Sequence, residues 1–169
     1  MKRKTISHFI AGLVTGAVYI ILFVAYYYKG LSFSENTLIL FAPYLLSFLL
    51  IFIAVILHGN SRNNHVTFGE LFNYGFKSTA IFVLVISAFM FFFLRYSDYK
   101  KKLDIEMTNR IKSEKELTGD KKELAMELKG SLTIIIIGGA IFTNVIIGTV
   151  ASLLAASVAR KDVVPLPDR

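Results

Sequence analysis

Three histidines and one carboxylate form a candidate group for binding a divalent metal: His8, His58, His65 and Glu70. Imidazole nitrogens and carboxylate oxygens are suitable ligands for zinc and similar ions. Their spacing argues against such a site, because a polar loop separates His58 from His65 and His8 lies on another apolar run. We therefore expect histidines at a membrane interface, and we predict no metal and no cofactor.

Other catalytic patterns are missing from the sequence. It contains no cysteine, which excludes thiolate metal sites, disulfides and cysteine nucleophiles. We find no paired carboxylates in the apolar runs, no Ser/His/Asp arrangement, no phosphate-binding glycine loop and no zinc-protease motif. Chemistry inside a membrane needs several convergent ionisable groups, so we predict that the protein is not an enzyme.

The segment Thr67-Phe68-Gly69-Glu70 has the pattern of a helix capping box. In such a box the hydroxyl and the carboxylate each bind one backbone N–H group at the start of a helix. We therefore predict a helix start near Thr67, with Gly75 and Phe76 on its apolar face and Tyr74 and Lys77 on the other. We interpret Lys77 as an interfacial residue whose ammonium reaches the headgroups, or alternatively contacts an anion or lipid.

Small residues at helical spacing mark candidate packing surfaces between membrane helices. Gly12 and Gly16 are four residues apart in the first apolar run, and small residues let two helix backbones approach closely. In the last run, Asn144, Gly148 and Ser152 share a stripe that we expect to face protein. Lipid offers the Asn144 amide no partner, so we expect it to bond to another helix, with a solute pathway as the alternative.

The elements that carry these residues are apolar runs long enough to cross a bilayer. Of the 169 residues, 54% are hydrophobic and 18% are charged, which does not suit a soluble domain of this length. About 20 helical residues cross the hydrocarbon core. We predict an all-α polytopic protein, a single four-helix membrane domain over residues 1–169, with spans at about 9–28, 37–57, 74–94 and 132–158.

A charged connection precedes the last span. Leu103, Met107 and Ile111 recur every fourth residue, which is typical of an amphipathic helix, and Thr118-Gly119-Asp120 interrupts the pattern. We predict an extramembrane helical hairpin at about 96–130, which is either a solvated connector or a docking surface for a partner protein. Ten basic residues between Arg95 and Lys129 are offset by eight acidic ones, so we expect no nucleic acid.

Basic residues next to the spans bear on orientation. Lys2 to Lys4 and Arg160-Lys161 directly flank the first and last spans, which favours cytoplasmic termini. With that orientation the inner side holds eight basic residues and the outer side eleven, but much of the long connection lies away from the membrane. We expect a multi-pass protein of the bacterial inner membrane, with the lipid bilayer as its surroundings.

The stretch V-T-F-G-E-L-F-N-Y-G-F-K, from Val66 to Lys77, resembles the domain of unknown function 4199 family of small four-span membrane proteins, found mainly in Bacteroidota. The likeness covers nearly the whole chain, and Phe68 to Phe76 is its most specific part. The resemblance implies a four-helix membrane domain. It implies no established activity and supplies no catalytic residues.

Together these observations predict a non-enzymatic integral membrane protein of unestablished biochemical activity, a structural or accessory component. It would act through helix–helix and protein–protein association, as a homo-oligomer or with other membrane proteins. The alternative is a small oligomeric transporter or channel, which Asn144, Lys77 and the mid-helix Pro43 would favour.

Overall fold

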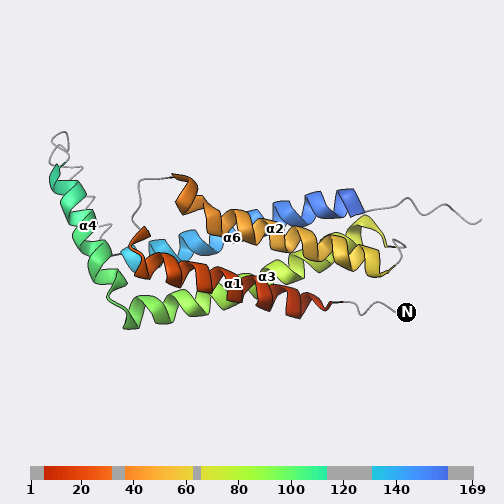
Figure 1. Cartoon of the computed structure of the whole chain (residues 1–169), viewed down its shortest axis with the longest axis horizontal. Coiled ribbons are helices and arrows are strands. Elements are labelled where there is room, and N and C mark those ends of the chain that lie inside the picture. Colours follow the sequence, from red (N-terminus) through yellow and green to blue (C-terminus); the bar gives the residue numbers. More distant parts are fainter. Residues whose placement is uncertain (1–5, 32–36, 63–65, 114–130, 160–169) are drawn as a thin grey trace, which may run out of the picture. The chain divides into compact units, whose positions relative to one another are not determined.

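The computed structural model describes residues 6–31, 37–62, 66–113 and 131–159, and these residues form helices without any strand (Figure 1). The elements are α1 (His8–Tyr28), α2 (Thr37–Ser61), α3 (Phe68–Tyr96), α4 (Tyr99–Ser113) and α6 (Leu132–Ala159). The predicted all-α class is therefore confirmed.

Four of these helices are long and apolar enough to cross a membrane: His8–Tyr28, Phe41–Ser61, Phe68–Tyr96 and Thr133–Ala159. Each exceeds the roughly 20 residues that a hydrocarbon core requires. The chain is thus a multi-pass membrane protein. The third helix is longer than the span expected at about 74–94, because it starts at Phe68; its 29 residues correspond to about 43 Å.

Local signals fix both ends of α1. The Ser7 hydroxyl accepts a hydrogen bond from the Ile10 N–H group at 3.3 Å, which satisfies one of the backbone donors at the helix start. At the other end Gly30 has φ of 69°, a left-handed conformation that favours glycine and ends the helix after Tyr28.

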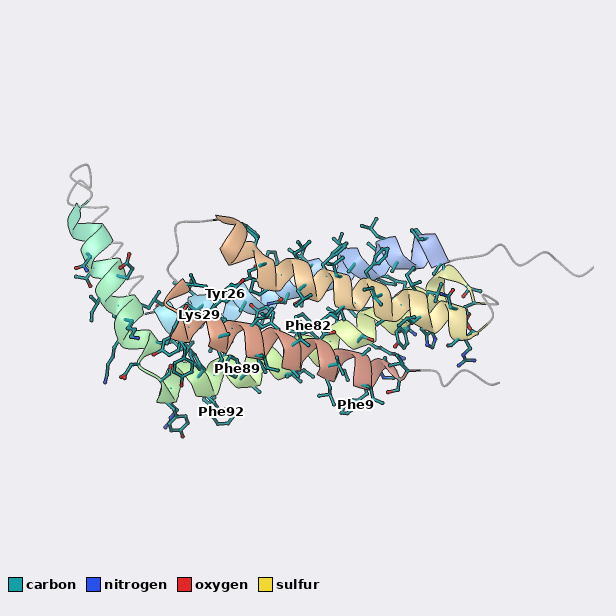
Figure 2. All side chains as sticks on the ribbon, in the orientation of Figure 1. Phe9, Tyr26, Lys29, Phe82, Phe89 and Phe92 are labelled. Carbon is teal, nitrogen blue, oxygen red and sulfur yellow. The ribbon has the colours of Figure 1, made fainter. Side chains whose placement is uncertain are left out.

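The chain divides into two compact units, residues 1–86 with 143–169 and residues 87–142. In the first unit α1, α2, the start of α3 and the end of α6 run alongside one another (Figure 1). Phe82 is fully buried among these helices, whereas Phe9 extends outward from α1 (Figure 2). A further core cluster consists of Ala11, Val55, Val66, Leu71, Tyr74, Ala155 and Ala156.

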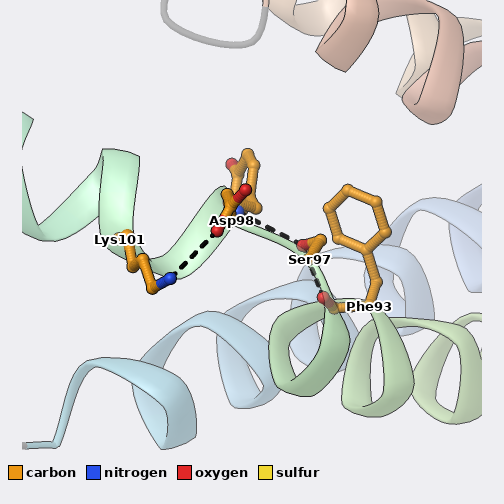
Figure 3. Close-up of polar contacts among 5 residues, drawn as sticks. Phe93, Ser97, Asp98 and Lys101 are labelled. Carbon is orange, nitrogen blue, oxygen red and sulfur yellow. Dashed lines mark hydrogen bonds and ion pairs between the residues drawn. The ribbon is translucent and has the colours of Figure 1, made fainter.

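The second unit contains the end of α3, α4 and the start of α6. Between α3 and α4 the Ser97 hydroxyl donates to the Phe93 carbonyl and accepts from the Tyr99 N–H group, which turns the chain at the end of α3 (Figure 3). Lys101 and Asp98 form an exposed ion pair at 3.1 Å. Exposed pairs of this kind contribute at most about 1 kcal/mol.

Of the hairpin expected at about 96–130, the structure describes the first arm, α4. The interruption at Thr118-Gly119-Asp120 and the expected second arm lie outside the described residues, so the hairpin stays a prediction.

Candidate functional site

The first close contact between helices joins α1 to α3 through Gly12 and Gly16. A methyl group at Gly12 would lie 2.5 Å from the Ser78 carbonyl oxygen, and one at Gly16 would lie 2.8 Å from Val85 Cγ1. Any larger side chain at these two positions would therefore push the helices apart. Both glycines are buried, and they allow the backbone of α1 to lie directly against α3.

A second close contact joins α3 to α6. A methyl group at Gly75 would lie 2.5 Å from the Ser152 Oγ atom and 2.7 Å from Val55 Cγ2, and one at Gly148 would overlap the Thr79 side chain. Gly148 and Ser152, expected to face protein, are thus brought together with Gly75 and Thr79. Gly75 and Thr79 were not predicted as packing residues, although their four-residue spacing is the same signal that marks Gly12 and Gly16.

Buried hydroxyl groups on these helices bond to their own backbone. Each hydroxyl donates to the carbonyl oxygen four residues earlier, at distances between 2.6 and 3.0 Å, and the groups involved are Thr15, Ser47, Ser78, Thr79 and Ser152. A hydroxyl that bonds within its own helix can be buried at little cost. These side chains therefore serve packing and need no ligand to satisfy them.

Asn144 lies in the same stripe of α6 and is fully buried, as are Ala151 and Ser152. The opposite stripe is exposed: Phe142 is 68% exposed, and Ile146, Val150 and Leu153 are exposed as well. On a membrane helix this division places small residues toward protein and large apolar residues toward lipid.

An aromatic cluster closes one end of the first unit, where α1 begins, α2 ends and α3 begins. The His58 ring stacks on the Tyr74 ring with 3.9 Å between centroids and an interplanar angle of 15°. The His8 ring meets the Tyr74 ring edge-on, with 6.4 Å between centroids. The Tyr74 hydroxyl donates to the Ile6 carbonyl oxygen at 3.0 Å, so it ties the start of α1 to α3.

The cluster corrects the predicted faces of α3. Tyr74 was expected on the polar face, but it is 7% exposed and belongs to the core, whereas Phe76, expected on the apolar face, is 45% exposed. The physical reason is that lipid is as apolar as phenylalanine, so hydrophobicity does not tell the protein-facing side of a membrane helix from the lipid-facing side.

Thr67 and Glu70 form the reciprocal contacts of a capping box at the start of α3. The Thr67 N–H group donates to Glu70 Oε2 at 2.9 Å, and the Glu70 N–H group donates to Thr67 Oγ1 at 3.3 Å. Val66 and Leu71, which flank the box, are both buried in the core cluster. Lys77 is exposed, two and a half turns further along the helix.

The described residues contain no group of three or more histidine, cysteine, aspartate or glutamate side chains that could hold a metal ion. His8 and His58 meet around Tyr74 instead, and His65 lies outside the described residues. What the arrangement offers is therefore helix packing, together with an open apolar cavity.

This cavity is an apolar groove between α1 and α2, and its volume is about 410 Å³. Its walls are aliphatic except for one threonine, and consist of Ile6, Ile10, Ala11, Val14 and Thr15 from α1 and Leu50, Ile53, Ala54 and Leu57 from α2. The groove opens to the outside of the helix pair, because Ile10, Val14, Ile53 and Leu57 are all exposed.

This fold and these contacts define a class, the small multi-pass helical membrane proteins whose helices meet through glycine and small hydroxyl residues. The sequence profile of the family described as "Protein of unknown function (DUF4199)" matches residues 11–161, and the chain belongs to that family. The expected family is thereby confirmed. No curated protein and no solved structure gives a significant match to the chain.

Proposed function

We propose that this chain is a non-enzymatic protein of the bacterial inner membrane that acts through helix–helix association, with itself or with other membrane proteins. In this proposal both termini are cytoplasmic, as the basic residues flanking the first and last spans favour. The chain would thus be a structural or accessory component.

The observation that carries the proposal is a difference among the glycines of the membrane helices. Gly12, Gly16, Gly75 and Gly148 each lie against another helix of the chain, whereas no atom of the second unit, to which Gly138 and Gly139 belong, comes within 4 Å of a methyl group built at either glycine. Both glycines lie on α6, inside an apolar span. Exposed small residues in a membrane span permit close approach of a further helix, from a second copy or a partner.

The polar side chains of the bundle support the same proposal. The buried hydroxyls donate within their own helices, and the two histidines of the described residues pack against Tyr74. These groups are used in packing, and the exposed surface of the spans is available to recognise another helix.

Purification in a mild detergent tests the proposal through a Gly139→Leu variant. The wild type should show an oligomeric mass by light scattering, or a stoichiometric co-purifying membrane protein by mass spectrometry, and Gly139→Leu should lose it. Gly69→Leu is a matched control, because Gly69 is equally open but lies in the first turn of α3.

A wild-type monomer without a partner would contradict the proposal. If such a protein also passed an ion or solute across liposomes, and lost that flux on Asn144→Leu, the alternative of a small transporter or channel would take its place.

A further inference from the structure

We propose that the groove between α1 and α2 is a lipid-binding site that takes one acyl chain of an anionic phospholipid. The inference does not depend on the proposed function, because it concerns a different surface and a different ligand.

The length of the groove matches one leaflet. On α1 it extends from Ile6 to Thr15, about 13 Å, and on α2 from Leu50 to Leu57, about 10 Å. Half of a hydrocarbon core is about 15 Å. Ile6 lies just before the start of α1 and Leu57 lies in the last turns of α2, so the groove begins at one membrane surface and ends near the bilayer centre.

The width of the groove suits an extended chain and not a helix. A volume of about 410 Å³ over about 13 Å gives a mean cross-section of about 30 Å², whereas a helix with its side chains has roughly 80–110 Å². A third transmembrane helix from a second copy could therefore place only side chains in the groove, not its body.

The chemistry of the walls excludes an extended peptide as well. A peptide backbone in the hydrocarbon layer needs hydrogen-bond partners for each N–H and C=O group. The only hydroxyl in the walls belongs to Thr15, and it already donates to the Ala11 carbonyl oxygen at 2.9 Å. A hydrocarbon chain needs no such partner, and it buries apolar surface along both walls.

A basic residue beside the mouth favours an anionic headgroup. Arg62 is exposed and follows the end of α2, beyond Leu57 of the groove wall. A lysine or arginine at the level of the headgroups favours anionic lipid through its charge. The Tyr74 hydroxyl holds the Ile6 carbonyl at 3.0 Å, which fixes the wall of the groove at this mouth.

Native mass spectrometry of the delipidated full chain tests the site, with phosphatidylglycerol and phosphatidylcholine of identical acyl chains as probes. The wild type should bind one phosphatidylglycerol saturably and in preference to phosphatidylcholine. Ala54→Phe and Val14→Phe, which fill the groove from its two walls, should both lose this lipid. Ala80→Phe should keep it, because Ala80 is exposed on α3 outside the groove.

Arg62→Gln should keep a lipid in the groove but lower the preference for phosphatidylglycerol about fivefold. Circular dichroism and the melting temperature identify any variant that fails to fold. Val14 is half-exposed, so the folding of Val14→Phe does not depend on core packing at this position. Retention of the lipid by folded Val14→Phe would overturn the proposal. So would a wild-type dimer that Val14→Phe converts to monomer with unchanged lipid binding, since the groove would then be an interface between copies.

Discussion

At the scale of single residues, the polar groups of the membrane helices are held by packing. Tyr74 contacts the rings of His8 and His58 and donates a hydrogen bond to the Ile6 carbonyl oxygen. Asn144 is fully buried in the small-residue stripe of α6. A side chain held in this way contributes to stability, so its replacement should change the melting temperature before it changes any activity.

The stripe of α6 predicts an order of stability among three substitutions. Gly148→Leu should destabilise most, by about 1–3 kcal/mol, because its side chain would collide with Thr79 and separate α6 from α3. Asn144→Leu should cost about 0.5–2 kcal/mol, the usual range for the interhelical polar contact that the sequence predicts for this amide. Phe142→Leu should have little effect, because Phe142 is mostly exposed.

Thermal melts of the three variants in one detergent check this order. If Phe142→Leu and Gly148→Leu cause similar damage, the faces of α6 have been assigned wrongly. Asn144→Leu also serves the flux measurement described above, so its stability has to be known before any loss of flux is interpreted.

Two substitutions of Tyr74 measure separately how much its hydroxyl and its ring contribute to stability. Tyr74→Phe removes the bond to Ile6 and should cost about 1 kcal/mol, whereas Tyr74→Ala also removes the stacking partner of His58 and should cost about 3 kcal/mol or more. Tyr28→Phe is the control, because Tyr28 is 81% exposed at the end of α1. Equal melting temperatures for Tyr74→Phe and the wild type would show that the hydroxyl does not tie α1 to α3.

At the scale of whole helices, the sequence predicts where each helix lies in the chain better than it predicts which side of the helix faces protein. Uninterrupted apolar runs locate the four long helices, and the Thr67–Glu70 pattern gives a start for α3 within one residue of the observed Phe68. On α3, Tyr74 and Phe76 were predicted on the wrong faces because they were ranked by polarity, whereas Gly75 is buried and Lys77 exposed as expected.

Small residues indicate the protein-facing side of a membrane helix better than polarity does. Gly75, Ser78 and Thr79 recur at three- and four-residue spacing on α3, and all three are buried. Backbones approach one another only where side chains are small, and that rule holds in lipid, where hydrophobicity no longer discriminates. The stacking of His58 on Tyr74 could not be predicted, since it depends on how α2 and α3 are aligned.

The capping box of α3 predicts a non-additive pair of substitutions. Thr67→Ala and Glu70→Ala should each lower stability by about 0.5–2 kcal/mol. The double variant should lose less than the sum, because each change breaks the same reciprocal contacts between Thr67 and Glu70. Chemical or thermal unfolding of the four proteins in detergent gives the coupling free energy.

The Glu70→Gln variant distinguishes a capping role of Glu70 from a role in a cellular activity. Glutamine can still close the box, so this variant should stay close to the wild type in stability. Strictly additive losses for the two alanine variants would contradict a reciprocal cap. A cellular activity that disappears in Glu70→Gln at unchanged stability would show that Glu70 has a role beyond capping.

At the scale of the whole molecule, four candidate spans in one chain require its helix ends to alternate between the two sides of the membrane. With four crossings, residues that follow α1 lie on the same side of the membrane as α4. Residues that follow α2 lie on the same side of the membrane as both termini. The packing surfaces, the groove and the proposed association all rest on this arrangement, which makes it the central claim to test.

Labelling of single introduced cysteines in intact spheroplasts tests it most directly, because the chain has no cysteine of its own. Lys29→Cys after α1 and Ser113→Cys at the end of α4 should react with a membrane-impermeant thiol reagent. Ser61→Cys at the end of α2 should react only after permeabilisation, while a permeant reagent should label all three. The reversed pattern would contradict cytoplasmic termini, and labelling of all three positions from outside would contradict four crossings.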